Sequence, residues 1–135
     1  MSLLYHPEVG TIVRVDLNEG FRVPEMRKRR PCIIISPPIA NRAQLCTIVP
    51  LSTSVPRPPQ AHHCQIEFDP PLPFPYASPV MWVKADMVMT VAFHRLKLLH
   101  LQGRGEDGAR QYDIRVIGEA KLNEVRRCVA SAIGM

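Results

Sequence analysis

The chain carries its most informative segment between two prolines: Arg29-Arg30-Pro31-Cys32-Ile33-Ile34-Ile35-Ser36-Pro37. Its three isoleucines are β-branched and follow one another without a polar residue. A short continuous apolar run between breakers is typical of a strand that is buried on both faces. Pro31 has no backbone N–H to donate, so it belongs at the first position of a strand or on a sheet edge. The segment therefore predicts a central strand that begins close to Pro31.

Four consecutive cations lead into this strand: Arg27, Lys28, Arg29 and Arg30. Like charges at this density repel one another, and an anion such as a phosphate backbone would relieve the repulsion. The whole chain has a formal net charge of +5 and a pI near 9.3. This charge favours a polyanionic partner, although net charge bears on non-specific binding and not on fold.

Length and composition are those of a globular protein. The 135 residues predict one domain, 1–135, with a sizeable core. The four cysteines include no C-x-x-C pair, which argues against a zinc ribbon. Three of them lie in apolar strand-like runs, which predicts buried free thiols and a reducing compartment. The N-terminal apolar cluster is too short for a signal peptide. No run approaches the roughly 20 apolar residues of a membrane helix, so we expect a cytoplasmic protein without membrane association.

Short strands separated by breaker-rich loops make up most of the sequence. Alternating or continuous apolar patterns predict strands, besides the central one, at 10–17, 45–49, 64–68 and 80–84. Pro50 is expected to end the second of these. Residues 87–93 fit a strand and a short helix equally well. Many prolines lie in the loops 55–63 and 69–79, which must be extended.

The C-terminal third predicts a hairpin followed by a helix. Three glycines within 103–108 separate the runs 96–102 and 110–116, which favours a hairpin. Within 119–133, one apolar helix stripe is formed by Leu122, Val125, Val129 and Ile133. The whole order predicts a mainly β (α+β) fold, a small, strongly curved antiparallel sheet or barrel with a packed C-terminal α-helix.

Four motifs occur in an order and spacing that resemble one known family. They are Gly10-Thr11-Ile12-Val13-Arg14-Val15-Asp16, Arg30-Pro31-Cys32-Ile33-Ile34-Ile35-Ser36, Ile48-Val49-Pro50-Leu51-Ser52-Thr53, and Val83-Lys84-Ala85-Asp86 with Thr90-Val91. Over roughly residues 8–133 the chain resembles the MazF/PemK (Kid) toxins of bacterial toxin–antitoxin systems. The resemblance implies an SH3-like small β-barrel of the CcdB/MazF/PemK type that acts as a homodimer. It also implies a metal-independent, cofactor-free endoribonuclease (an mRNA interferase) that cuts single-stranded RNA and is blocked by a cognate protein antitoxin.

The resemblance further implies which residues are catalytic. Arg30 stands where the family has an arginine that is essential to cleavage, and Ser52 and Thr53 cover the family's hydroxyl pair. Asp86 matches an aspartate that some members use as a base, and Lys84 stands where those members have arginine. The expected catalytic set is therefore Arg30, Ser52, Thr53, Asp86 and Lys84.

The loop before the central strand is expected to bind RNA. Glu25 lies five residues before Arg30, where the family's loop has a glutamate, and Arg27, Lys28 and Arg29 supply positive charge. Pro24 stands where one branch of the family has a histidine. Together with Lys84, this departure leaves the acid and base unassigned.

Cleavage through the 2′-hydroxyl needs a base for its proton, cations and donors where charge develops on phosphorus, and an acid near the leaving oxygen. Arg30 offers a planar fork of donors for phosphate oxygens but is a poor proton donor. Lys84 is then the chemically better acid, and Asp86 or Glu25 the better base. Which hydroxyl of the Ser-Thr pair faces the phosphate stays open.

Each of these assignments has an alternative. Arg30 can instead be a solvated cation or pair with a nearby carboxylate, from Asp16, Glu19 or Glu25. His62 and His63 look like a metal pair, but they lie in a proline-rich loop without an evident third ligand, so we expect surface histidines and no metal site. Two functional rivals also stand, a non-enzymatic gyrase poison resembling CcdB and a nucleic-acid-binding barrel that has lost its activity.

Overall fold

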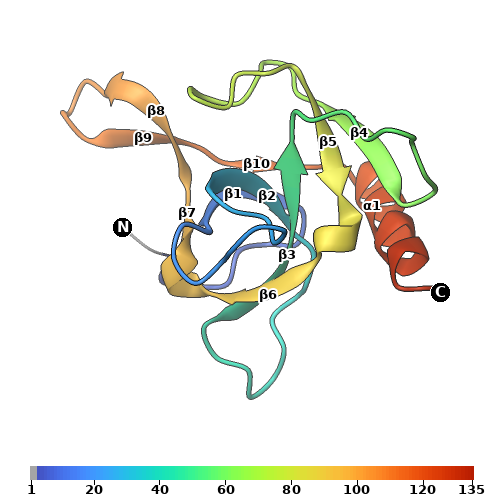
Figure 1. Cartoon of the computed structure of the whole chain (residues 1–135). Coiled ribbons are helices and arrows are strands. Elements are labelled where there is room, and N and C mark those ends of the chain that lie inside the picture. Colours follow the sequence, from blue (N-terminus) through green and yellow to red (C-terminus); the bar gives the residue numbers. More distant parts are fainter. Residues whose placement is uncertain (1–2) are drawn as a thin grey trace.

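The computed structural model describes residues 3–135, apart from the side chains of Gln102 and Arg104, and consists mainly of antiparallel strands with a C-terminal helix (Figure 1). The strands are β1 (Thr11–Asp16), β2 (Arg29–Ile34), β3 (Leu45–Ser52), β4 (His63–Glu67), β5 (Val80–Lys84), β6 (Met89–Ala92), β7 (Leu96–Lys97), β8 (Leu99–Arg104), β9 (Arg110–Asp113) and β10 (Arg115–Val116). The remaining elements are the 3₁₀ turns η1 (Ala85–Met87) and η2 (Phe93–Arg95) and the helix α1 (Glu119–Ala132).

Five of the strands close into a small barrel. Strand β1 pairs with β2, β2 with β3, β3 with β6, and β7 returns to β1, all antiparallel. The turn η2 carries the chain from β6 to β7 and so completes the circle. The inside of the barrel is filled by ten buried side chains, those of Leu3, Val13, Val15, Leu17, Cys32, Ile34, Cys46, Ile48, Val91 and Leu96.

A second core lies outside the barrel. Beyond β6, strand β3 pairs with β5, and β5 pairs with β4. Helix α1 packs against β4 and η1 (Figure 1). Ile33 faces this second core while Cys32 and Ile34 face the barrel interior, because successive strand residues point to opposite faces. The predicted central strand, buried on both faces, is therefore confirmed as β2.

The expected end of a strand at Val49 is wrong, because β3 runs through Pro50 to Ser52. On one side, Pro50 lies opposite Cys32 of β2. On its other side, β3 pairs with β6 up to Ile48 and with β5 only from Leu51 onward. Pro50 thus lies in the gap between two partner strands, where a missing N–H leaves no ladder bond unmade.

Residues 87–93, for which the sequence allowed a strand or a short helix, contain both. The 3₁₀ turn η1 ends at Met87, and β6 begins at Met89. The predicted hairpin is confirmed as β8 and β9. It is shorter than its flanking runs, because β7 and β10 pair with β1 instead of with each other. In Figure 1 the hairpin extends away from the barrel.

Helix α1 confirms the predicted C-terminal helix, ending one residue before Ile133. Leu122, Val125 and Cys128 are buried, the last two in the second core, whereas Ile133 is 61% exposed and departs from the predicted stripe. Within the described residues, no helix has the length and apolar character needed to cross a membrane.

Candidate active site

Strands β2 and β3 bring Arg30 and Ser52 to one open end of the barrel. Cys32 lies opposite Pro50 in the β2–β3 ladder, and this register, continued by two residues, brings Arg30 to the level of Ser52. Opposed residues of an antiparallel pair project from the same face. Both side chains therefore belong to the face that carries Cys32 into the barrel interior. Arg30 is half-buried there, and Ser52 is only 6% exposed.

Strands β5 and β4 extend the same face beyond the barrel. Ser52 lies opposite Trp82, and Trp82 lies opposite Gln65. Two residues farther along, Lys84 lies opposite His63. The other face of β4 and β5 is buried in the second core, so these side chains occupy the partly accessible side.

The segment after Ser52 ties this surface together. The Ser52 Oγ accepts a hydrogen bond of 3.1 Å from the backbone N–H of Ser54. The Lys84 Nζ donates one of 3.1 Å to the carbonyl oxygen of the same residue. Thr53, between them in sequence, is exposed. Of the predicted hydroxyl pair, Ser52 is thus held in place by contacts that also hold Lys84.

The cations before β2 differ in their contacts. Arg29 forms an ion pair of 3.1 Å with Asp16, the residue opposite it on β1. Arg30 instead donates from Nε to the carbonyl oxygen of Arg27 at 2.6 Å. Within residues 3–135, the Nη atoms of Arg30 have neither an ion-pair nor a hydrogen-bond partner among the described side chains. The alternative in which a carboxylate neutralises Arg30 is therefore wrong.

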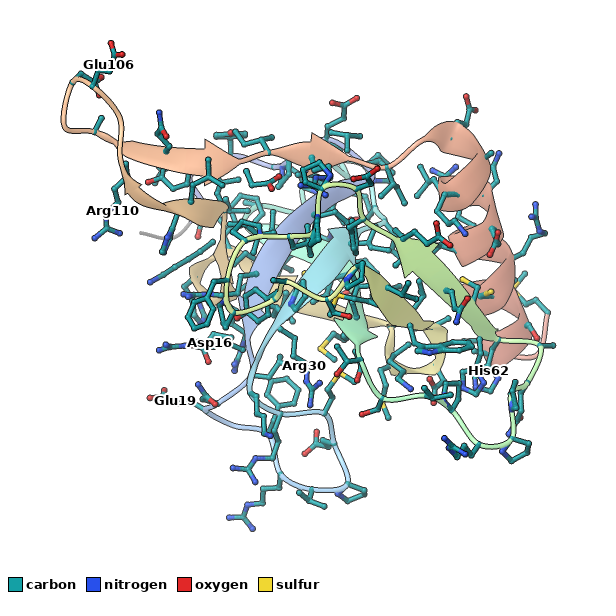
Figure 2. The ribbon with its side chains drawn as sticks, turned by 90° about the horizontal axis from the view of Figure 1, so that it is seen from above. Asp16, Glu19, Arg30, His62, Glu106 and Arg110 are labelled. Carbon is teal, nitrogen blue, oxygen red and sulfur yellow. The ribbon has the colours of Figure 1, made fainter. Side chains whose placement is uncertain are left out.

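The loop between β1 and β2 is otherwise open to solvent. Arg27, Lys28 and Glu25 are all exposed. The Glu25 Oε1 accepts a hydrogen bond of 3.2 Å from the backbone N–H of Arg22, so this carboxylate braces its own loop. The side chains labelled along the lower part of Figure 2 run from Glu19 on this loop through Arg30 to His62.

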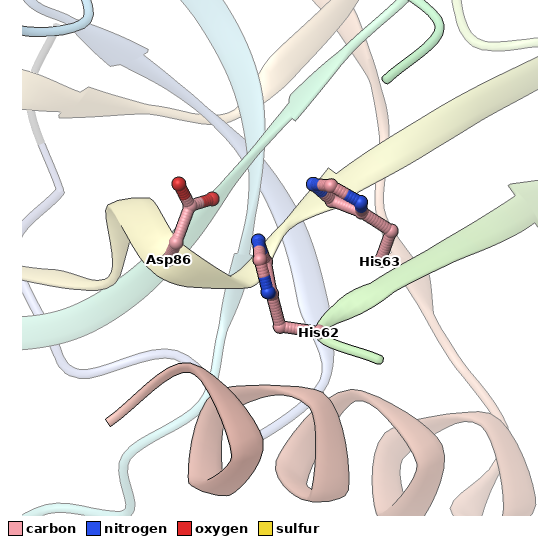
Figure 3. Close-up of side chains that lie close together, drawn as sticks. All are labelled: His62, His63 and Asp86. Atoms are coloured by element: carbon pink, nitrogen blue, oxygen red, sulfur yellow. The ribbon is translucent and has the colours of Figure 1, made fainter. Parts of the chain in front are cut away.

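A cluster of two imidazoles and a carboxylate lies beside Lys84. His62 and His63 have ring centroids 4.1 Å apart and planes tilted by 53°. With Asp86 on η1, one nitrogen or oxygen of each side chain lies within 4.8 Å of the others (Figure 3). The expectation that no third ligand lies near the histidines is wrong. The missed signal was the β4–β5 pairing, which sets His63 opposite Lys84 and so brings Asp86 close.

Among the described side chains, this cluster is the group whose composition suits a metal ion. Two imidazoles and a carboxylate are ligands that Zn²⁺ accepts. Two contacts weigh against a resident cation. The His63 Nδ1 already accepts a hydrogen bond of 2.9 Å from the Gln60 N–H, and the cationic side chain of Lys84 lies opposite His63.

Burial shifts the pKa values of several titratable groups in and near the candidate site. Loss of solvent lowers the pKa of Arg30, which nevertheless stays charged because a guanidinium begins far above neutrality. Burial, then the positive charges of His62 and Lys84, lowers the pKa of His63, and Asp86 partly opposes them. All four cysteines are buried free thiols, one more than the three for which the sequence predicted this. Burial raises the pKa of Cys64 to about 12 and that of Cys46 to about 11, so neither is a nucleophile at neutral pH.

Solved structures with the same fold include MazF proteins and endoribonucleases. A MazF from Deinococcus radiodurans superposes with a TM-score of 0.61 at 19% identity, covering 97% of this chain and 99% of that one. An endoribonuclease from a mycobacterial species gives 0.56 at 20% identity, covering 96% and 92%. A mycobacterial endoribonuclease in complex with its cognate antitoxin gives 0.54 at 21% identity, covering 96% and 94%. These similarities confirm the predicted fold, a small β-barrel of the MazF type with a C-terminal helix.

Sequence comparison places the chain in a family. No curated protein sequence matches it significantly. A family model described as PemK-like, MazF-like toxin of type II toxin–antitoxin system matches residues 8–133, nearly the whole chain. The predicted MazF/PemK resemblance is thereby confirmed: this chain belongs to the PemK-like, MazF-like toxins of type II toxin–antitoxin systems.

Proposed function

We propose that this toxin is an endoribonuclease that cuts single-stranded RNA through attack of a 2′-hydroxyl on the adjacent phosphorus, without a metal ion. The observation that carries the proposal is the shared face of Arg30, Ser52 and Lys84 at the barrel mouth. In the reaction, the 2′-oxygen forms a bond to phosphorus and the bond to the 5′-oxygen breaks. The products carry a 2′,3′-cyclic phosphate, or its opened form, and a 5′-hydroxyl.

Arg30 and Ser52 stabilise the negative charge that develops on the phosphate in the transition state. The Nη atoms of Arg30 have no partner among the described side chains, and its Nε is fixed by the Arg27 carbonyl. A guanidinium held in this way presents two parallel donors to phosphate oxygens. The Ser52 Oγ accepts from Ser54 and keeps its own proton to donate to the same phosphate. Each such donor contributes on the order of 3 kcal/mol to the transition state.

Lys84 and the neighbouring Asp86 transfer the protons, Lys84 as the donor and Asp86 as the acceptor. Its ammonium has three protons, one of which is bound to the Ser54 carbonyl, so two remain for a leaving oxygen. Asp86 lies two residues away on η1 and is exposed. The Glu25 carboxylate is held by its own loop, which favours Asp86 over Glu25 for the side that accepts a proton.

RNA binding is supported by two basic surfaces that meet at Arg29. One is the exposed loop with Arg27 and Lys28. The other is a pocket of about 320 Å³ whose charged and aromatic lining includes Tyr5, Arg14, Arg29, Lys97, His100, Arg110 and Tyr112. Cations along a groove with interleaved aromatic rings bind a single strand through its phosphates and its bases.

The family and the solved relatives suggest the setting of this activity. The proposed toxin works in the cytoplasm as one domain over 1–135, and a cognate protein antitoxin blocks its site. A complex of this kind has been solved for a mycobacterial endoribonuclease.

A homodimer is supported by exposed apolar side chains at alternate positions on the β9–β10 edge, those of Tyr112, Ile114 and Val116.

The test is incubation of the purified protein with single-stranded RNA in EDTA. We expect wild type to cut, and Arg30→Ala to cut about 10²- to 10³-fold more slowly. Equal cutting by both proteins would reject the proposed site. RNA binding with a steep salt dependence but without cutting would identify a binding module instead. Intact RNA together with gyrase-linked DNA breaks in cells would identify a gyrase poison.

A further inference from the structure

In the His62–His63–Asp86 cluster, Asp86 is the proton acceptor of the site as proposed so far, and the two histidines have no role in it. Figure 3 shows the two imidazoles and the carboxylate turned toward a common point. One polar atom from each lies within 4.8 Å of the others, and the rings are 4.1 Å apart between centroids. Three groups that can accept or donate protons are thus gathered in one place, although they come from two separate segments.

The cluster is continuous with the candidate active site. His63 lies opposite Lys84, and Lys84 donates to the carbonyl oxygen of Ser54. The N–H of Ser54 in turn donates to the Ser52 Oγ. His63 also lines a groove with Trp82, the residue opposite Ser52. Imidazoles, ammonium and hydroxyl therefore share one surface.

The hydrogen bonds distinguish the two histidines. The Nδ1 of His63 accepts from the Gln60 N–H at 2.9 Å, so the neutral ring carries its proton on Nε2. His63 is thereby fixed as a hydrogen-bond donor toward the cluster. Within the described residues, neither ring nitrogen of His62 has a hydrogen-bond partner. His62 thus keeps a lone pair to accept a proton.

We propose that His62 is the general base of RNA cleavage, with Asp86 as the residue that holds the imidazolium formed. This inference rests on the proposed endoribonuclease function and moves the base from Asp86 to His62. The His62 imidazole takes the proton of the 2′-hydroxyl as the oxygen bonds to phosphorus. The bond from phosphorus to the 5′-oxygen breaks, and that oxygen takes a proton from Lys84. His63 donates from Nε2 to a phosphate oxygen.

An imidazole suits this task better than an exposed carboxylate. Bases work best when their pKa lies near the working pH, and the ordinary value for histidine is about 6.5 against about 3.9 for aspartate. Charged groups face the cluster from each neighbouring element, Lys84 from β5, Asp86 from η1, and Lys121 and Glu124 of α1 across the groove that His63 lines. Asp86 places a carboxylate oxygen within 4.8 Å of a nitrogen of each imidazole, and its charge partly opposes the lowering of the pKa of His63.

The first experiment compares His62→Gln and Asp86→Asn with His94→Gln, an exposed histidine outside the cluster, in single-turnover cleavage with EDTA. We expect His62→Gln to lose about 10²- to 10⁴-fold in rate and to lose the acidic limb of the pH–rate profile. Asp86→Asn should keep that limb and lose less rate than His62→Gln, because Asp86 holds the imidazolium in place and takes no proton itself. His94→Gln should match wild type. Circular dichroism of each variant checks the fold.

The second experiment separates base from acid with an RNA whose scissile 5′-oxygen is replaced by sulfur. A thiolate leaves without a proton, so the substrate no longer needs an acid. We expect Lys84→Met to recover most of its lost rate on this substrate and His62→Gln to recover none. A structural defect in either variant would affect both substrates alike.

The outcomes separate this inference from the function on which it rests. If wild type cuts RNA and His62→Gln cuts within about threefold of it at every pH, His62 is not the base while the nuclease assignment stands. Recovery of His62→Gln on the sulfur substrate would make His62 the acid and also overturn the inference. Activity that EDTA abolishes and Zn²⁺ restores would make the cluster a metal site. A wild type that never cuts RNA rejects the nuclease and the base together.

Discussion

The Lys84 Nζ lies 3.1 Å from the carbonyl oxygen of Ser54 and donates a hydrogen bond to it. This contact joins β5 to the segment that leaves β3, and the N–H of the same serine holds the Ser52 Oγ. The ammonium and the hydroxyl are therefore positioned by one residue. A site positioned before substrate arrives loses less conformational freedom when it binds.

Arg30→Lys tests the need for a planar donor fork. The lysine keeps the positive charge but replaces the bidentate donors with a compact ammonium, so we expect kcat to fall about 10²-fold with little change in RNA affinity. Single-turnover cleavage and anisotropy binding measure the two effects. Arg126→Ala, on the exposed face of α1, is the matched control and should behave as wild type. A lysine variant with full activity would show that charge alone suffices.

Arg27→Ala and Lys28→Ala test whether the basic loop before β2 contacts RNA phosphates. Both side chains are exposed, and each phosphate contact that is lost should reduce the slope of log K against log salt by about 0.7. The measurement is fluorescence anisotropy with a 2′-O-methyl oligonucleotide, which cannot be cut by 2′-hydroxyl attack. Arg57→Ala, in another exposed loop, serves as the comparison. Slopes unchanged from wild type would place the RNA elsewhere.

Ile33→Ala tests the double-sided burial of β2. Ile33 is fully buried in the second core, and deleting a large buried aliphatic side chain costs about 2–5 kcal/mol in the free energy of unfolding. Urea unfolding followed by circular dichroism measures the loss. Ile133→Ala removes the same atoms from a residue that is 61% exposed and should change stability by less than about 0.5 kcal/mol.

Asp16→Asn tests the support of Arg29. The N–H of Asn18 and then Arg29 lower the pKa of Asp16, with burial partly opposing them. Because the folded pKa is the lower one, ionised Asp16 stabilises the fold above about pH 3.9, and this stability is lost as pH falls through the folded value. The pair is largely exposed, so we expect at most about 1 kcal/mol near neutral pH.

Urea midpoints of wild type and Asp16→Asn, measured from pH 7 down to pH 2, check this expectation. The gap between the two proteins should close at the acidic end. Glu19→Gln, on the same loop, should show no comparable trend. A gap that stays constant with pH would mean that the substitution acts through packing and not through charge.

The barrel and helix were predictable because they depend on local patterns. The run Ile33–Ile35 between prolines indicated β2, and the stripe with Leu122 and Val125 indicated α1. Pro50 misled the prediction because its effect depends on which neighbours flank it. A proline ends a strand only where its N–H is needed, and Pro50 lies in the gap between β6 and β5.

The positions of some candidate site residues were predictable for the same reason. Arg30, Ser52 and Lys84 stand next to recognisable strands, so their positions follow from the motifs. The grouping of His62 and His63 with Asp86 depends on pairing between strands that are far apart in sequence. Composition of the loop 55–63 gives no hint of it. Aligning the predicted strands 64–68 and 80–84 as an antiparallel pair would have placed Asp86 near the two histidines.

Strand β3 exchanges one neighbour for another along its length, β6 for its first half and β5 for its last two residues. The portion that encloses the apolar interior ends before the portion that carries Ser52 begins. We therefore expect a substitution at Ser52 to leave the pairing of β3 with β6 intact. The pairing of β3 with β6 and the attachment of Ser52 thus depend on different stretches of one strand.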